Sequence, residues 1–154
     1  MTSEPVEPDE TALIERILEL SLFEGFTAHG VKRLLDTGSV REVKKDEVII
    51  REHAPPKEAL LLIDGALEVL VDKDGAEFAV AEASPGQIVG EIALLCDMPR
   101  TASVRAKEDS CLLVWEGEAF RRLLFSDAGF ARRVFRQSLR AVIESEKQLI
   151  QSVS

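Results

Sequence analysis

The sequence predicts a mainly β protein with flanking α-helices: an antiparallel jelly-roll (double-stranded β-helix) barrel with N-terminal helices and a long C-terminal helix. Apolar residues recur close to helical spacing over residues 11–37, and they fall at every second place in much of the barrel, residues 38–116. Helical spacing returns over residues 117–152. Many short segments separated by Gly and Pro turns favour an antiparallel barrel over repeated βαβ units.

Length and composition indicate one folded domain. A chain of 154 residues can bury a proper core, and 45% hydrophobic with 31% charged residues is typical of a globular protein. Residues 1–10 are acidic, contain proline and have few apolar side chains, so we expect a disordered acidic tail. The single domain then covers residues 11–154.

Charge and cysteine usage restrict the partners and the compartment. A formal net charge of −9 argues against nucleic-acid binding by this chain, because contacts to phosphates need clustered Lys and Arg. Cys96 and Cys111 have no disulfide-framework spacing, and no signal peptide or long apolar run precedes them. We therefore expect a cytoplasmic protein with reduced thiols and no membrane contact.

Two helices are predicted before the barrel. Apolar residues close to helical spacing indicate the first over residues 11–21. Thr27 can cap the second, which continues to about Leu35. Phe23 and Phe26 separate the two helices in the sequence, and we expect them to pack the N-terminal helices against the barrel.

The barrel strands are marked by alternation and by turns. We predict strands over residues 40–43, 48–50, 59–63, 66–72, 77–83, 88–89, 102–106 and 111–115. Residues 73–75, Lys-Asp-Gly, are a hairpin signal, so the segments on either side are expected to pair. Trp115 ends the last strand, and we expect it to pack where the barrel meets the helices.

The most informative stretch runs from Gly90 to Ala106 and reads GEIALLCDMPRTASVRA. The glycine before Glu91 lets the backbone bend sharply, and the apolar run after it predicts one capped turn packed on the sheet. Free N–H groups at the start of such a turn attract an anion. Arg100 can return over that site with a planar charged fork suited to phosphate, and Glu91 can accept hydrogen bonds from sugar hydroxyls.

This stretch resembles the phosphate-binding cassette of the cyclic nucleotide-binding domain family, which includes catabolite-activator-like regulators, cyclic-nucleotide-dependent kinases and gated channels. The resemblance extends from Ala12 to the last helix. It implies that Glu91 holds the ribose 2′-hydroxyl and Arg100 the cyclic phosphate. It also implies backbone contacts from Gly90, Ile92, Ala93 and Ala102, and hydroxyl contacts to the phosphate or the base edge from Thr101 and Ser103.

One loop departs from the family pattern. In residues 52–58, EHAPPKE, His53 stands where the family usually has a glycine, and Leu60 stands where an aromatic residue is common. Each change weakens the fit of the turn expected there, in which glycine is favoured.

An enzyme on a similar barrel would need a metal or catalytic site inside it. A cupin-type metal centre uses several His and a carboxylate, whereas this chain has only His29 and His53, and neither has a neighbour at ligand spacing. No Ser-His-Asp or Cys-His arrangement can be assembled from the sequence either. We therefore expect no metal, no cofactor and no catalytic activity.

Two helices are predicted after the barrel. Residues 118–125 indicate a short helix, and Asp127 can cap a long one over residues 128–152. Apolar residues of the long helix fall at steps of three and four, with Glu146 interrupting the series between the third and the fourth: Phe135, Leu139, Val142, Leu149 and Val153. This helix either folds back on its own barrel or forms a parallel homodimer while covering the ligand. We favour the second, since a monomer would leave an apolar edge exposed.

The resemblance also concerns the approach of this helix to the ligand. Arg140 and residues 144–147 are similar to the part that nears the base in the catabolite-activator-like branch. Glu144 stands there in place of an expected hydroxyl residue, and Ser145 follows it.

The function we favour is that of a cyclic nucleotide sensor. Cyclic AMP, or alternatively cyclic GMP, binds the cassette of residues 90–106, and movement of the C-terminal helix signals to an unidentified output protein. Two alternatives stay open: a ligand-free protein-interaction module, and the sensory half of a truncated transcription regulator. Because no DNA-reading helix-turn-helix follows the last helix in this sequence, we expect the output domain to be separate or absent.

Overall fold

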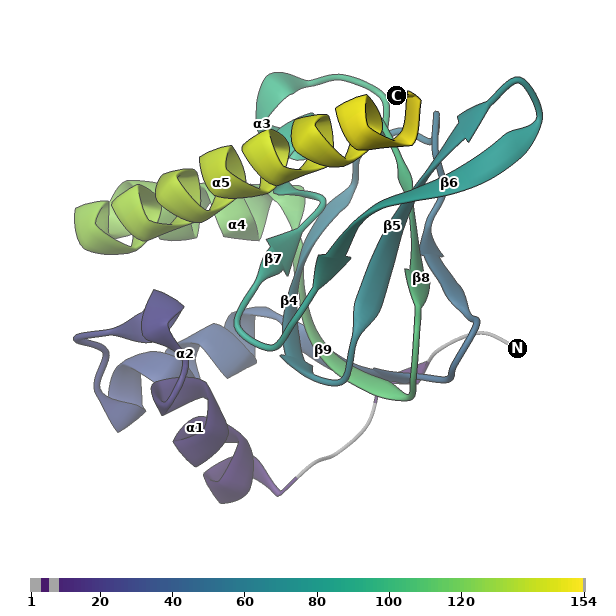
Figure 1. Ribbon diagram of the computed structural model, residues 1–154. Coiled ribbons are helices and arrows are strands. Elements are labelled where there is room, and N and C mark those ends of the chain that lie inside the picture. Colours follow the sequence, from purple (N-terminus) through teal and green to yellow (C-terminus); the bar gives the residue numbers. More distant parts are fainter. Residues whose placement is uncertain (1–3, 6–8, 154) are drawn as a thin grey trace.

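The computed structural model describes residues 4–5 and 9–153. Two antiparallel sheets face each other, and the helices gather at one side of them (Figure 1). One sheet has the strand order β1-β2-β9-β4-β7, and the other has the order β3-β8-β5-β6. The strands are β1 Glu4–Pro5, β2 Ser39–Val43, β3 Val48–Ile50, β4 Glu58–Asp64, β5 Leu67–Lys73, β6 Ala76–Ala83, β7 Ile88–Val89, β8 Ser103–Ala106 and β9 Ser110–Glu116.

The two sheets stay open, which corrects the closed barrel expected from the sequence. Among the described strands, no pairing joins an edge of one sheet to the other. The edge strands are too short to close the structure, because β7 has two residues before the chain bends into a helix and β3 has three. From β2 to β9, the strand positions themselves are confirmed to within one residue at each end.

The N-terminal segment differs from the expected disordered tail at its described positions. Glu4–Pro5 pair with β2, and Asp9 caps helix α1, Glu10–Leu18, by accepting a hydrogen bond from a first-turn N–H. The rest of that tail, residues 1–3 and 6–8, lies outside the described residues. Helix α1 ends before residue 21, where a 3-10 helix, η1, follows at Ser21–Phe23.

Helix α2, Ala28–Thr37, begins as predicted, because the Thr27 Oγ1 accepts a hydrogen bond from the Gly30 N–H at 3.0 Å. Three phenylalanine rings then join the N-terminal helices to the last helix. The ring centroids of Phe23, Phe26 and Phe130 lie 5.2 to 5.8 Å apart. Phe23 also belongs to the core that includes β4, so the predicted packing extends to the C-terminal helix, a contact that the sequence did not indicate.

Strand β4 is buried on both faces. Its residues 59–63 are each at most 2% exposed. The odd-numbered side chains pack into a core between the first sheet and the helices, and the even-numbered ones pack into a core between the two sheets. A strand in that position has a continuous apolar run instead of alternation. The strand therefore forms a wall shared by two cores.

Two predicted local features are confirmed. Lys73 pairs with Ala76 across the hairpin, and Asp74 and Gly75 have positive φ values of 56° and 86°, as a two-residue type I′ turn requires. Trp115 is fully buried, and its ring centroid lies 5.7 Å from that of Phe120 on the following helix. It packs where the first sheet meets the helices.

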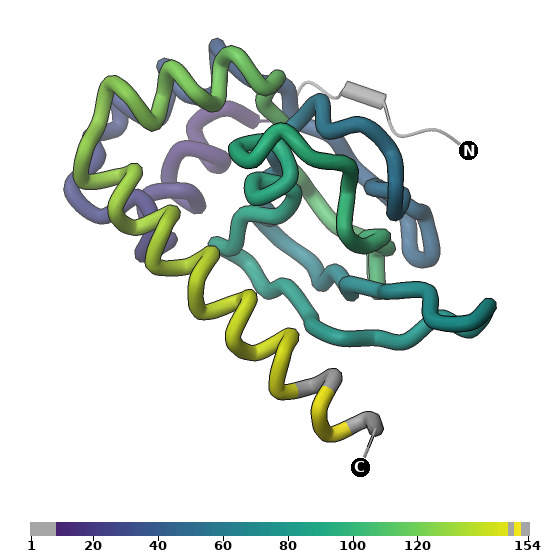
Figure 2. Tube along the Cα trace, turned by 90° about the horizontal axis from the view of Figure 1, so that it is seen from above, coloured from purple at the N-terminus to yellow at the C-terminus, as the bar shows by residue number. Residues whose placement is uncertain are grey.

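The C-terminal region consists of α4, Gly117–Ser126, and α5, Ala128–Val153. Asp127 caps α5 as predicted, since its Oδ1 accepts a hydrogen bond from the Phe130 N–H at 2.9 Å. Helix α5 has 26 residues and runs past β7 and β6 (Figure 2). None of the described helices combines the length and the apolar character that crossing a membrane requires.

Candidate functional site

The candidate site is built where β7 ends. Gly90 follows β7 with a φ of 82° and precedes α3, Glu91–Cys96. Such a φ is in the left-handed region that glycine favours. A Cβ at this position would lie 2.7 Å from Arg100 Nη1 and 3.0 Å from Ile50 Cδ1. Both the backbone conformation and the approach of Arg100 therefore require glycine at position 90.

The Arg100 side chain points into the fold and is only 7% exposed. Its Nη1 donates a hydrogen bond to the carbonyl oxygen of Gly90, and its Nη2 donates to the carbonyl oxygen of Glu58 at 2.7 Å. Burial lowers the pKa of Arg100, and the negative charges of Glu58 and Glu91 oppose that effect. The guanidinium is thus held at the cassette by two uncharged acceptors.

Glu91 is the first residue of α3 and is 5% exposed. Its Oε2 has no hydrogen-bond partner among the described residues. Burial raises the pKa of Glu91, whereas its own backbone N–H, the nearby Ser138 hydroxyl of α5 and the charge of Arg100 act in the opposite direction. A buried acceptor without a donor carries a desolvation cost, so Oε2 is suited to the hydroxyl of a ligand.

The first turn of α3 adds backbone donors beside this pair. Ala93 is buried and Ile92 is half-buried. The N–H groups of a helix's first turn have no acceptor within the helix. The structure therefore brings Gly90, Glu91, Ile92, Ala93 and Arg100 together, as the sequence predicts.

The three predicted residues after Arg100 lie in different surroundings. Thr101 is exposed, and Ala102 is half-buried. The Ser103 Oγ already accepts a hydrogen bond from the backbone N–H of Glu52 at 2.9 Å. Of the two predicted hydroxyls, only that of Thr101 is therefore unengaged within the described chain.

A family model for the cyclic nucleotide-binding domain matches residues 40–127, which is more than half of the chain. The chain belongs to the cyclic nucleotide-binding domain family. The matched range contains the whole cassette, from Gly90 to Ala106.

Members of this family with similar sequences belong to longer proteins. The cAMP-dependent protein kinase regulatory subunit of Mycosarcoma maydis is 34% identical over 128 residues, covering 79% of this chain and 24% of the relative. A probable potassium channel of Arabidopsis thaliana is 28% identical over 131 residues, covering 81% of this chain and 15% of the channel. The chain thus spans a quarter or less of the length of these two curated relatives.

Solved structures share the fold. A crystal structure of a cyclic nucleotide-binding domain from Methylobacillus flagellatus has a TM-score of 0.74 at 21% identity, covering 97% of this chain and 89% of that chain. A cAMP-binding acyltransferase from Mycobacterium smegmatis has a TM-score of 0.70 at 28% identity, covering 82% of this chain and 40% of that one. These similarities support two antiparallel sheets with flanking helices and a C-terminal helix.

The loop that departs from the family pattern keeps the family's backbone shape. His53 has a φ of 73°, in the region where glycine is favoured. Its N–H donates to the Arg100 carbonyl oxygen at 2.8 Å, while its side chain is 83% exposed. His29 is exposed on α2, and no three His, Cys, Asp or Glu of the described residues cluster as metal ligands.

Two residues of α5 that the sequence analysis did not select also reach the site. The Gln137 Nε2 donates to the Gly86 carbonyl oxygen at 2.9 Å, and its Oε1 accepts from the Ile88 N–H at 2.6 Å. Ser138 lies near enough to Glu91 to lower the pKa of its carboxyl. A signal for both residues exists, because they lie three and four positions after the buried Val134, where an amphipathic helix normally has apolar residues.

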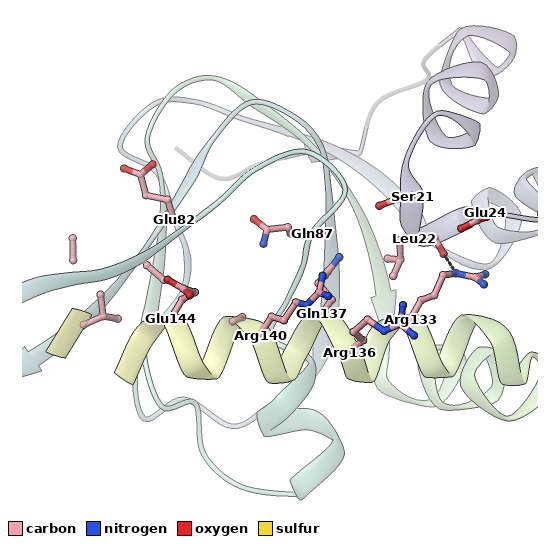
Figure 3. Close-up of a pocket in the computed structure, with 14 residues that line it drawn as sticks. Ser21, Leu22, Glu24, Glu82, Gln87, Arg133, Arg136, Gln137, Arg140 and Glu144 are labelled. Carbon is pink, nitrogen blue, oxygen red and sulfur yellow. Dashed lines mark hydrogen bonds between the residues drawn. The ribbon is translucent and has the colours of Figure 1, made fainter. Parts of the chain in front are cut away.

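A cavity of about 830 Å³ lies between α5 and β6 (Figure 3). Its charged and amide lining from α5 consists of Arg133, Arg136, Gln137, Arg140 and Glu144. At one end the Arg133 Nε donates to the Leu22 carbonyl oxygen at 2.7 Å. The family resemblance implies that Arg140 and Glu144 approach the base of the ligand. In the structure both residues line this cavity, and none of the eight predicted cassette residues does.

Proposed function

We propose that the chain is a cyclic nucleotide sensor that binds cyclic AMP or cyclic GMP at the cassette of residues 90–106. The observation that carries this proposal is one buried site that contains both the Arg100 guanidinium and a carboxylate oxygen of Glu91 without a donor. A cyclic nucleotide offers a partner for each, because its anionic phosphate is joined to a ribose that has a free 2′-hydroxyl.

Arg100 is suited to exchange its present acceptors for phosphate oxygens. Hydrogen bonds between two charged groups are roughly twice as strong as those between neutral groups, and the guanidinium fork matches two phosphate oxygens. The carbonyl oxygens of Gly90 and Glu58 are neutral acceptors. The first-turn N–H groups of α3 supply further donors to the same phosphate.

Glu91 is assigned to the ribose, and Thr101 to the phosphate or the base edge. The Glu91 Oε2 accepts a hydrogen bond from the ribose 2′-hydroxyl, which relieves its unpartnered state. Thr101 is exposed beside Arg100, so its hydroxyl can donate to the phosphate or to the base edge. We assign the chain no catalytic step.

The signal is assigned to α5. This helix is bonded through Gln137 to Ile88 of β7 and to Gly86 in the turn before it, and β7 leads directly into Gly90. If the helix has two positions, a ligand moves the equilibrium between them only by as much as its affinities for the two positions differ. The kinase regulatory subunit and the channel named above carry the matched region within longer chains, which supports a regulatory module that acts on an attached or separate output domain.

A homodimer through α5 is proposed as the assembly. Five large apolar side chains of this helix are between 47% and 65% exposed: Phe135, Leu139, Val142, Ile143 and Ile150. Burying them against a second copy gains about 25 cal/mol for each Å² of apolar surface removed from water. The same face also suits a ligand-free protein-interaction module, the alternative function. A measurement of cyclic nucleotide binding distinguishes that module from a sensor.

Isothermal titration calorimetry with cyclic AMP, cyclic GMP and AMP tests the function. We expect saturable binding of at least one cyclic nucleotide and much weaker binding of AMP. Arg100→Ala should weaken binding by about 2–5 kcal/mol, roughly 30- to 5,000-fold, because it leaves the phosphate charge without its partner. Arg122→Ala removes an exposed guanidinium from α4 and serves as the matched control.

Two results would contradict the proposed function. One is a folded wild-type protein that binds neither cyclic nucleotide. The other is an Arg100→Ala protein that binds cyclic AMP as tightly as the wild type. Circular dichroism of each variant establishes that it is folded.

A further inference from the structure

Helix α5 holds the segment that enters the cassette. The Gln137 side chain lines the cavity of Figure 3, and its amide donates to the Gly86 carbonyl oxygen at 2.9 Å and accepts from the Ile88 N–H at 2.6 Å. Strand β7 is at the edge of its sheet, where it pairs with β4 alone among the described strands. A side-chain amide has the donor and the acceptor of a peptide group, so Gln137 bonds this free edge as a neighbouring strand would.

Helix α4 holds the other end of the cassette helix. The Arg121 Nη2 donates to the Leu94 carbonyl oxygen at 2.9 Å and to the Asp97 Oδ1 at 3.1 Å. Leu94 lies in the last turn of α3, where carbonyl groups lack a donor within the helix, and Asp97 caps the helix end. Arginine near a helix C-terminus commonly satisfies such carbonyls. The two bonds therefore join the end of α3 to α4.

Both ends of α3 thus depend on side chains from other helices. This helix has only six residues, and helices that short are not stable by themselves. The buried Leu94 side chain packs it on the core, but apolar packing has no direction. Hydrogen bonds are directional, so the bonds at the two ends orient the helix and the turn at Gly90.

We propose that Gln137 and Arg121 are positioning residues for the cyclic nucleotide: they hold the two ends of the cassette helix, so that its backbone donors and Glu91 are in place before the ligand arrives. This inference rests on the function proposed above. Neither side chain is assigned a contact with the ligand. A site that is ordered in advance binds more tightly, because no cost of ordering it is subtracted from the binding free energy.

The hold on the cassette is tested by replacing each side chain with methionine, which has no hydrogen-bond donor. Isothermal titration calorimetry should show cyclic AMP binding weakened about 3- to 30-fold by Gln137→Met, which loses two bonds. Arg121→Met should weaken it about 2- to 10-fold, since the bond to the exposed Asp97 contributes little.

Arg133→Met is the matched control. It removes a bond of the same kind from α5, because the Arg133 Nε donates to the Leu22 carbonyl oxygen at 2.7 Å, but that bond is made to η1 and not to the cassette. We expect its affinity for cyclic AMP to stay within about twofold of the wild type. Urea denaturation should show that its free energy of unfolding falls as much as that of Gln137→Met.

Gln137→Glu tests the bond to Gly86 by itself. The introduced carboxylate still accepts from the Ile88 N–H, but it has no hydrogen to donate to the Gly86 carbonyl oxygen, and protonation restores one. The ratio of this variant's Kd for cyclic AMP to that of the wild type should therefore fall as the pH is lowered from about 7 to about 5. A constant ratio would contradict the role of the Gly86 bond.

The outcomes separate this inference from the proposed function. Unchanged affinity of Gln137→Met or Arg121→Met, or an equal loss in Arg133→Met, would overturn the two-sided hold while the function stands. A wild-type protein that binds no cyclic nucleotide would overturn the function and the inference with it. Hydrogen exchange gives a second readout without ligand: amides of residues 88–97 should exchange faster in the first two variants than in Arg133→Met.

Discussion

The two faces of α5 are held in opposite ways. On one face, Phe130 is fully buried, and Arg133 and Gln137 bond to the backbone of η1, of the turn before β7 and of β7 itself. On the other face, Leu139 is 65% exposed and Ile150 is 61% exposed. The first face is part of the domain's own core, whereas the second face presents apolar side chains that the described chain does not cover.

This difference teaches that ligand sensing and assembly occupy opposite faces of one helix. An α-helix is a rigid rod joined by hydrogen bonds from turn to turn, so displacement of one face carries the other face with it. The following changes break or sharpen the contrast between the faces.

Removing a ring from the core-facing side should have the largest effect. Phe130→Ala should destabilise the fold by about 3–5 kcal/mol, because it leaves a cavity beside Phe23 and Phe26. Phe135→Ala, on the exposed face, should cost less than about 1 kcal/mol in the monomer, since that ring is 55% exposed. Urea denaturation measures the free energy of unfolding of both variants. Similar losses would show that the two faces are not different.

Charging the exposed face should affect assembly and not folding. Leu139→Glu combined with Ile143→Glu places two carboxylates on that apolar face, so we expect the dimer to dissociate while the monomer keeps its circular dichroism spectrum. Arg122→Glu changes the charge of an exposed position on α4 and should leave the dimer intact. Sedimentation velocity reports the mass of each variant. A wild-type protein that sediments as a monomer at all concentrations would exclude the proposed homodimer.

The contribution of Glu91 to the stability of the fold should depend on pH. Burial raises the pKa of Glu91, so the folded state favours the protonated carboxyl, and the folded protein loses stability as the pH rises through that raised pKa. Glu91→Gln should therefore raise the melting temperature at neutral pH. The gain should vanish below the ordinary glutamate pKa of 4.5, where Glu91 is protonated in both states. Melting curves of both proteins from neutral pH to below pH 4.5 test this expectation. An equal rise in melting temperature at every pH would contradict it.

The smallest effect concerns the two cysteines, whose reactivity compares an exposed position with a half-buried one. Burial raises the pKa of Cys111 to about 11, whereas Cys96 is exposed at the end of α3. Because the thiolate is the reactive form, iodoacetamide at neutral pH should modify Cys96 and leave Cys111 largely unmodified. Peptide mass spectrometry identifies the modified residue. Preferential modification of Cys111 would show that its surroundings are more open than described.

The sequence predicted those parts of the site that local geometry decides. Gly90, Glu91 and Arg100 lie in one continuous motif, and the turn that joins them follows from a glycine and a short apolar run. Thr27 and Asp127 were likewise identifiable as caps, because a cap acts within three residues of its own position.

The contacts of α5 could not be predicted in the same way. Gln137 reaches the strand before the cassette from a distant part of the chain, and a polar residue on a helix normally faces water. The prediction of a closed barrel was wrong for a related reason. Short apolar segments show that strands form, but whether their edges meet depends on tertiary geometry.

The shared wall formed by β4 also makes this strand a natural spectroscopic probe. Leu61 packs toward the helices, while Leu60 and Leu62 pack between the sheets. With isotope-labelled leucine methyl groups, adjacent residues of one strand would give separate NMR signals for the two cores. If the signals of both cores change when a cyclic nucleotide is added, the protein responds as one body. If the signals of only one core change, the sheet separates the response of that core from the other.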